Sequence, residues 1–206
     1  MDKLFDSKPL APFKSIIIFG PPGSGKGTLG KALGAGGNHF HLSSGDIFRG
    51  LAPDSPAGKL YHTYAHKGHL LPDAITIDIW HHYVLGLIDT NRYYPEKQLL
   101  LLDGIPRTVA QAIELEKHIS VSRIINLQVP NVEVLIKRLQ RRAVIEKRVD
   151  DMDESVLKKR MEVYERETLK LLNHYPADLI STFDGSKKPL DVLKDVLVEL
   201  SGVLSL

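Results

Sequence analysis

The chain has no cysteine and no run of apolar residues long enough to cross a lipid bilayer. The first absence excludes disulfide bonds and thiolate zinc sites, and it is typical of a reducing compartment. The second excludes a transmembrane helix, and residues 1–13 also lack the apolar segment of a secretion signal. We therefore expect a cytoplasmic protein that does not bind membranes.

An excess of charge of one sign is also missing, because 27 basic residues stand against 25 acidic ones and leave a formal net charge of +2. A chain with this balance is not expected to bind nucleic acid, so any site for an anion must be local. The 206 residues, 43% of them hydrophobic, are enough to bury one sizeable core. We expect a single domain over residues 1–206, and a monomer.

Short apolar runs alternate along the chain with longer amphipathic segments. Strands are predicted at Ser15–Phe19, His39–Leu42, Gln98–Leu102, Arg123–Val129 and Leu179–Phe183. Helices are predicted at Lys26–Leu33, Pro72–Asp89, Val109–His118, Val132–Arg142, Asp153–Tyr175 and Leu190–Leu200. This order predicts an α/β fold, in which a central parallel sheet is flanked by helices on both faces. Two stretches interrupt the alternation: a polar arm at about 43–72, and a short charged connection at about 143–149 that is suited to act as a lid.

The most informative stretch is Ile16–Thr28, in which an apolar run leads into G-x-x-x-x-G-K. The run is typical of a buried strand, and the glycines after it let the backbone turn tightly and point N–H groups at one anion. A helix that begins near Lys26 adds its dipole to this nest of amides, and the Lys26 ammonium reaches a phosphate. The alternative is a glycine-rich turn that happens to contain a lysine. The fixed order of features after a strand favours nucleotide binding.

A second apolar run, Leu99–Leu102, ends in Asp103, which is the pattern of a strand whose carboxylate holds Mg²⁺ directly or through water. Because parallel strands end at the same edge of a sheet, Asp103 is expected in the crevice beside the glycine-rich loop. Arg107 and Gln111 follow, four residues apart at the start of a helix. This spacing puts them on one helix face, from which both can reach the same ligand.

Two further stretches have a structural interpretation beside the functional one. Ser43–Arg49 is expected to form a capped helix, from which Arg49 projects toward a second phosphate group. Arg138 and Arg142 share a helix face, and Arg148 lies across the short connection from them. Such a basic run is usually a solvated face, or a groove for single-stranded nucleic acid. However, it lacks interleaved aromatic residues, and a protein that handles two phosphate chains needs several fixed cations.

With these motifs in this order, the sequence resembles the adenylate kinase family over nearly its whole length. The matching stretches are Gly20–Thr28, His41–Arg49, Gly68–Asp73, Leu101–Gln111, Arg148–Tyr164 and Phe183–Lys187. The resemblance accounts for the position of Thr28, because the family pattern is G-x-P-G-x-G-K-G-T. It implies a P-loop NTPase-type three-layer sandwich, with MgATP as the phosphoryl donor, AMP as the acceptor and two ADP as the products.

The resemblance also assigns residues to two nucleotide sites. Those implied to bind ATP are Gly23, Ser24, Gly25, Lys26, Gly27, Thr28, Arg138, Arg142, Ser186 and Lys187. Those implied to bind AMP are Ser44, Arg49, His69, Leu70, Leu71, Gly104, Ile105, Pro106, Arg107, Gln111, Arg148 and Arg160. The implied catalytic cations are Lys26, Arg107, Arg138, Arg142, Arg148 and Arg160. The Asp103 carboxylate is implied to hold Mg²⁺ through water.

The sequence departs from the family pattern at three places. Ile105 stands where the family usually has Phe, which is expected to alter packing near the acceptor base rather than the chemistry. The connection at 143–149 has the length of the family's short-lid form, so no structural zinc is expected, but it lacks the glycines common in short lids. Asp151 and Arg160 are one residue further apart than usual, so Arg160 is assigned by its spacing to Tyr164.

Transfer of a phosphoryl group to an acceptor that is already an anionic phosphate needs no general base. We therefore expect catalysis by positioning and electrostatics. One alternative is a kinase for UMP or CMP with the same fold and donor site. Another is a P-loop ATPase or nucleotide-dependent binding module, in which Arg49, Arg107 and Gln111 would have no ligand. Stimulation by AMP alone favours the first interpretation, whereas ATP hydrolysis without an acceptor favours the last.

Overall fold

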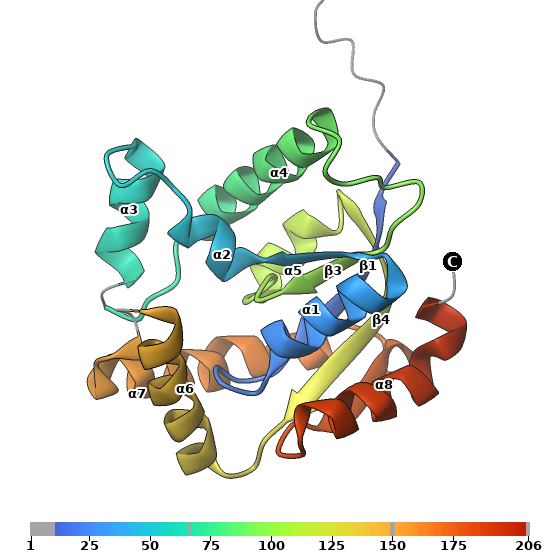
Figure 1. Cartoon of the computed structure of the whole chain (residues 1–206). Coiled ribbons are helices and arrows are strands. Elements are labelled where there is room, and N and C mark those ends of the chain that lie inside the picture. The colour runs from blue at the N-terminus through green and yellow to red at the C-terminus, as the bar shows by residue number, and fades with distance from the viewer. Residues whose placement is uncertain (1–10, 66, 149–150, 205–206) are drawn as a thin grey trace, which may run out of the picture.

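In a computed structural model of the chain, which describes residues 11–65, 67–148 and 151–204, five parallel strands form one sheet in the order β2-β3-β1-β4-β5. The strands are β1 (Phe13–Phe19), β2 (Phe40–Ser43), β3 (Leu100–Asp103), β4 (Ile119–Gln128) and β5 (Ile180–Asp184). Helices lie on both faces of this sheet (Figure 1). The predicted α/β architecture, a central parallel sheet flanked by helices, is therefore confirmed.

The outer layers are built by two pairs of helices. The first pair is α1 (Lys26–Gly37) with α8 (Pro189–Leu204), and the second is α4 (Asp73–Asp89) with α5 (Val109–Leu115).

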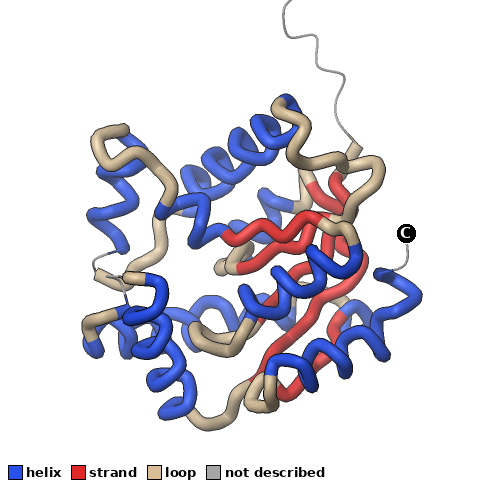
Figure 2. Tube along the Cα trace, in the orientation of Figure 1, coloured by secondary structure: helices blue, strands red, loops and turns tan. Residues whose placement is uncertain are grey.

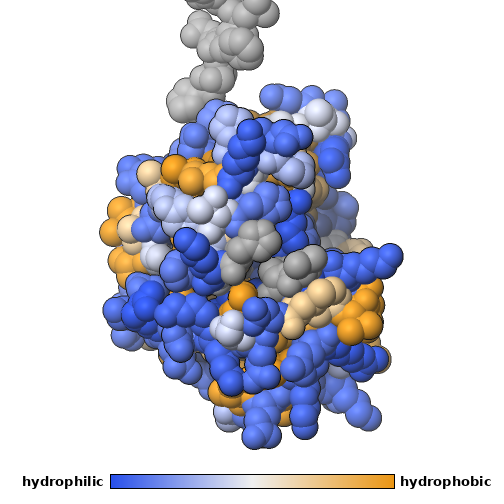
Figure 3. Space-filling view, turned by 90° about the vertical axis from the view of Figure 1, so that its left-hand side faces the viewer, coloured by the Kyte–Doolittle hydropathy of each residue, from blue (hydrophilic) through white to orange (hydrophobic). Residues whose placement is uncertain are grey.

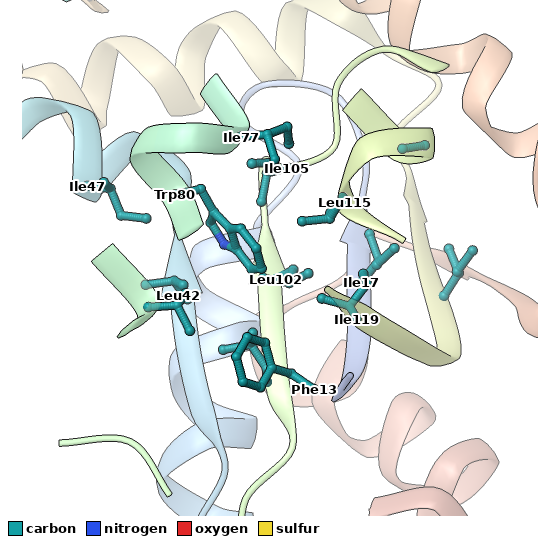
Figure 4. Close-up of a cluster of buried hydrophobic side chains, with 14 of the residues drawn as sticks. Phe13, Ile17, Leu42, Ile47, Ile77, Trp80, Leu102, Ile105, Leu115 and Ile119 are labelled. Carbon is teal, nitrogen blue, oxygen red and sulfur yellow. The ribbon is translucent and has the colours of Figure 1, made fainter. Parts of the chain in front are cut away.

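Side chains of the central strand β1 alternate between these layers. Ile16 and Ile18 pack beneath α1 and α8, whereas Ile17 packs beneath α4 and α5. Figure 4 shows the cluster of buried side chains between the sheet and the α4–α5 layer, in which Trp80 of α4 lies beside Leu102 of β3. Because both faces of the sheet are covered, the central strands β1 and β3 contain continuous apolar runs, Ile16–Phe19 and Leu100–Leu102, rather than alternating patterns.

Four further helices lie beyond the carboxyl ends of the strands: α2 (Ser44–Arg49), α3 (Pro56–Ala65), α6 (Val132–Glu146) and α7 (Glu154–Val163). A π-helical turn (Tyr164–Thr168) and a 3₁₀ turn (Leu169–Asn173) continue α7, and another 3₁₀ turn (Ala177–Leu179) precedes β5. In Figures 1 and 2, α2 and α3 project from the sheet as an arm, above the pair formed by α6 and α7.

Helix α6 is longer than the sequence predicts. Leu135, Leu139 and Ala143 form a buried stripe at a spacing of four, and this stripe carries the helix past the predicted end at Arg142. The first part of the predicted connection, residues 143–146, is therefore helical. This corrects the predicted start of the lid.

The helix ends at Lys147, which has a left-handed φ of 51° although it is not a glycine. Its backbone N–H donates to the carbonyl of Ala143 and closes the last turn. The predicted end of the connection, Val149, lies outside the described residues.

The segment predicted as one helix over 153–175 changes character after Val163. The π turn widens the helix there, and the Thr168 hydroxyl donates a hydrogen bond of 3.0 Å to the carbonyl of Arg107. Turns of this kind are frequent at functional sites. This one brings Tyr164 and Thr168 to the cavity described below.

The face on which α3, α6 and α7 lie is mostly hydrophilic, and its apolar residues form small patches between charged ones (Figure 3). Among the described residues, no helix has the length and apolar character needed to cross a bilayer.

Candidate active site

A cavity of about 620 Å³ opens between the arm, α6 and the carboxyl ends of β1 and β3. This volume is typical of sites for small molecules. Most residues that the sequence analysis assigned to a nucleotide site line it: Gly23, Ser24, Gly25, Lys26, Gly27, Thr28, Arg49, His69, Leu70, Leu71, Asp103, Gly104, Pro106, Arg107, Gln111, Arg138, Arg142, Arg148, Arg160 and Lys187. The residues predicted for ATP and those predicted for AMP therefore share one cavity.

Three assigned residues do not line the cavity. The Ser44 hydroxyl is buried and donates a hydrogen bond of 2.7 Å to the carbonyl of Gly104, so it ties the arm to the loop after β3. The Ser186 hydroxyl and backbone N–H both donate to Asp184. These two side chains have a structural role in this arrangement.

The third is Ile105, whose side chain is 1% exposed and belongs to the core cluster. Figure 4 shows it next to Ile77 of α4 in this cluster. Gly104, with a φ of 76°, turns the chain after β3, and the apolar side chain that follows enters the core. The Ile105 side chain therefore does not line the cavity, and its expected effect on packing beside the acceptor base stays a prediction.

The glycine-rich loop connects β1 to α1 as predicted. Gly20, Gly23 and Gly25 all have positive φ, and a Cβ atom on Gly23 would lie 2.8 Å from the carbonyl oxygen of Leu135. Only glycine fits such a position without a shift of the backbone. Helix α1 begins at Lys26, so its N-terminal amides point into the loop.

The Lys26 ammonium lies over this loop. Its Nζ donates to the carbonyls of Gly20 at 2.7 Å and Pro21 at 3.0 Å. Burial, assisted by the charge of the nearby Arg107 guanidinium, lowers the pKa of Lys26 to about 8 against the opposing effect of the Asp103 carboxylate. A buried cation with carbonyl partners is suited to receive phosphate oxygens, which would offset the cost of its burial.

This pKa predicts that any activity that depends on the Lys26 charge varies with pH. Lys26 is charged below pH 8 and loses its proton as the pH rises through 8. We therefore expect kcat/KM for MgATP, which reports the free enzyme, to fall between about pH 8 and 9.5. Steady-state kinetics across this range measure the effect. The Lys26→Arg variant keeps its charge, so its activity, although lower, should show no such fall. A wild-type profile that stays flat to about pH 10 contradicts the assignment.

Asp103 ends β3 beside this lysine, and its side chain is nearly buried. Burial raises the pKa of Asp103, but the His41 imidazole, whose Nε2 lies 3.6 Å from Oδ2, and the Lys26 ammonium more than offset this and keep the pKa below its usual value. The carboxylate is therefore ionised and faces the cavity. An anionic oxygen ligand fits Mg²⁺, which would take its remaining ligands from water and phosphate.

A buried carboxylate holds two of the predicted arginines together. Asp151 is fully buried, and its Oδ2 accepts from Arg142 Nε at 2.7 Å and lies 2.6 Å from Arg142 Nη2. Its other oxygen accepts from Arg160 Nη1. The sequence analysis gave Asp151 no role, although it follows Arg148 in the R-x-D-D motif. An acidic residue inside a basic run was the available signal.

Arg148 and Arg49 meet at a second carboxylate, that of Asp46 in α2. Arg49 Nη2 lies 2.5 Å from Asp46 Oδ1, and Arg148 Nη2 lies 3.6 Å from the same atom. Arg148 also pairs with Glu146 at 2.6 Å. Asp46 thus brings cations from the arm and from the end of α6 to one place, where a phosphate group would compete for them.

Arg138 lies apart from these arginines. Its two terminal nitrogens donate to the carbonyls of Gly185 at 2.7 Å and Ser186 at 3.1 Å. Arg138 is therefore held at the loop after β5, which contains Ser186 and Lys187, two residues that the resemblance implies bind ATP. Lys187 of the same loop pairs with Asp195 at 2.8 Å.

Arg107 and Gln111 form another part of the cavity wall, and Arg107 lies close enough to Lys26 to affect its pKa. Arg107 Nε donates to the Gly104 carbonyl at 2.7 Å, and burial together with the charge of Arg160 lowers the pKa of Arg107 to about 10. The side-chain amide of Gln111 is nearly buried and makes two hydrogen bonds. Its Oε1 accepts from the backbone N–H of Arg107, and its Nε2 donates to the Asp73 carboxylate. A cation and an amide therefore share one wall of the cavity, but Arg107 precedes Thr108, the N-cap of α5, so the predicted common helix face is not what brings them together.

Several lining residues were missed by the sequence analysis. Tyr61 and Tyr64 come from α3 of the arm, Thr76 from α4 and Thr168 from the π turn. Tyr61 stacks on Phe48 of α2, with ring centroids 5.9 Å apart. Two tyrosines at a spacing of three on this helix were the available signal for the arm.

A glycine-rich loop between a buried strand and a helix, beside a neighbouring parallel strand that ends in an ionised aspartate, defines the class of P-loop nucleotide-binding proteins. Within that class, the chain belongs to the adenylate kinase family, whose sequence model matches residues 18–179.

Comparison of this sequence with those of individual proteins leads to the same family. The adenylate kinase of a Cyanothece strain is 39% identical over 88% of this chain and 92% of its own length. That of Flavobacterium psychrophilum is 38% identical over 78% of this chain and 84% of its own length. That of Borrelia recurrentis is 32% identical over 91% of this chain and 97% of its own length.

Proposed function

We propose that this chain transfers the terminal phosphoryl group of MgATP to AMP and forms two ADP. As a member of the adenylate kinase family, it is a nucleoside monophosphate phosphotransferase. The observation that carries the proposal is that one cavity is lined both by the glycine-rich loop with Lys26 and by the wall formed by Arg107 and Gln111. Such a cavity suits a donor and an acceptor that each carry phosphate.

The reaction follows from these positions. A phosphate oxygen of AMP forms the new bond to the terminal phosphorus of ATP, and the bond from that phosphorus to the bridging oxygen breaks. The acceptor is already an anion, so no base is needed. Lys26, Arg142 and Arg160 offset the charge on the transferred group, and Arg107 and Arg49 hold the acceptor phosphate.

Mg²⁺ is expected to arrive with ATP. The ionised Asp103 would hold it, directly or through water, and the ion would neutralise phosphate charge when bound. The remaining steps of binding and orientation rest on the cations of the chain itself. A cytoplasmic location and a monomeric state stay predictions.

The family membership does not favour a UMP or CMP kinase. An ATPase or binding module would leave the Arg107 and Gln111 wall without a ligand.

Gln111→Ala is the variant that tests the acceptor. We expect kcat/KM for AMP to fall by an amount that corresponds to about 1 to 3 kcal/mol of transition-state stabilisation, because the base loses a hydrogen-bonding partner. KM for ATP should stay nearly unchanged. Coupled assays with AMP, CMP, UMP and GMP on both proteins measure this. Gln140→Ala, the same change at an exposed position of α6, is the matched control. A wild type that prefers CMP or UMP, or a variant with undiminished selectivity for AMP, contradicts the proposal.

A further inference from the structure

The side-chain amide of Gln111 is fixed at both ends by partners that allow one orientation. Its Oε1 accepts a hydrogen bond of 2.8 Å from the backbone N–H of Arg107. Its Nε2 donates one of 2.9 Å to Oδ1 of Asp73. A backbone N–H can only donate and an ionised carboxylate can only accept, so these partners identify the oxygen and the nitrogen of the amide.

Asp73 is itself held in place. It lies in the first turn of α4, and its Oδ1 also accepts a hydrogen bond of 2.9 Å from the Thr108 hydroxyl. The same hydroxyl accepts from the backbone N–H of Gln111 at 3.1 Å and caps α5. The carboxylate is therefore fixed relative to the helix that carries Gln111.

Rotation of the amide by half a turn would break both contacts. The amide oxygen would then face the Asp73 carboxylate, and the amide nitrogen would face the Arg107 N–H. Two acceptors and two donors would oppose each other in a nearly buried position, where unsatisfied polar groups are costly. Gln111 thus presents its remaining N–H and its remaining lone pair in a fixed order.

The order of donor and acceptor on Gln111 matters because purine bases differ in the order of donor and acceptor at positions 6 and 1. Adenine presents a donor at its 6-amino group and an acceptor at N1, whereas hypoxanthine and guanine present an acceptor at O6 and a donor at N1. An amide free to flip pairs with either edge, and a fixed amide pairs with one. We propose that Asp73 is a specificity-determining positioning residue, which fixes the Gln111 amide in the orientation that accepts AMP and rejects 6-oxopurine monophosphates. This inference rests on the proposed function.

The test compares kcat/KM for AMP and for inosine monophosphate, which differs from AMP only at this edge of the base. An asparagine at position 73 can accept or donate, so Asp73→Asn removes one of the two contacts that exclude the flipped orientation of Gln111 and leaves only the Arg107 N–H against it. We expect the ratio of AMP to inosine monophosphate to fall by about tenfold, mainly through KM, with kcat for AMP nearly unchanged. Asp73→Ala, which removes the acceptor altogether, should give the same fall. Asp78→Asn, an exposed position of the same helix, should leave the ratio unchanged.

A double-mutant cycle separates positioning from a general structural role. Gln111→Met removes the amide, so Asp73→Asn should change the ratio no further in that background. An equal fall in both backgrounds, or an unchanged ratio in folded single variants, overturns the role of Asp73 while AMP stays the preferred acceptor. A wild type that prefers a pyrimidine monophosphate instead contradicts the proposed function and this inference with it. Thermal unfolding of each variant verifies that it is folded.

Discussion

The Lys26→Met protein is expected to turn over at least roughly a hundredfold more slowly than wild type, which corresponds to about 2.7 kcal/mol of barrier. Lys26 contributes a cation above the glycine-rich loop, and methionine keeps the length of the side chain without the charge. The fold should persist, because the lowered pKa of Lys26 indicates that its buried charge is a cost to the folded protein.

Turnover at saturating MgATP and AMP, together with the melting temperature, measures both parts of this prediction. Lys194→Met, at an exposed position of α8, is the matched control and should behave as wild type. A folded Lys26→Met protein with near-native turnover would show that the loop does not position a transferring phosphate.

The second large effect is expected at Asp151, which holds Arg142 and Arg160 in one place. Asp151→Asn keeps the shape of the side chain and removes the charge between two guanidinium groups. We expect turnover to fall by about a hundredfold, because the two arginines no longer hold fixed positions. Stability should fall by about 2 kcal/mol, less than for a fully buried pair, because both arginines are partly exposed to water.

Glu154→Gln provides the comparison, since it removes the charge of an exposed ion pair with Lys158 on the same helix, α7. It should change neither turnover nor stability appreciably. Wild-type turnover in a folded Asp151→Asn protein would exclude a functional role for the arrangement around this carboxylate.

The parts of the site that the sequence predicts are those encoded by local patterns. The phosphate loop follows from one continuous stretch, Gly20–Thr28. Asp103 could be placed beside the loop because parallel strands end at one edge of the sheet. These inferences need no knowledge of packing between distant segments.

The parts that the sequence does not predict depend on such packing. Asp73 lies 38 residues before Gln111, and nothing in the spacing brings the two together. The direction of the Ile105 side chain is set by the turn at Gly104 and by the space in the core below it. Likewise, the end of α6 depends on how its buried stripe meets the other helices, which local propensity does not reveal.

The central claim is that a phosphoryl group passes from ATP to AMP in this cavity. The most direct measurement uses ATP with a radioactive terminal phosphate and identifies the product in which the label appears. It is made with each nucleoside monophosphate in turn and also without any acceptor. The account predicts that label appears in ADP when AMP is present, with a higher kcat/KM than for UMP or CMP, and that little is released as inorganic phosphate without an acceptor. Preferential labelling of UDP or CDP, or release of inorganic phosphate that does not depend on an acceptor, would contradict it.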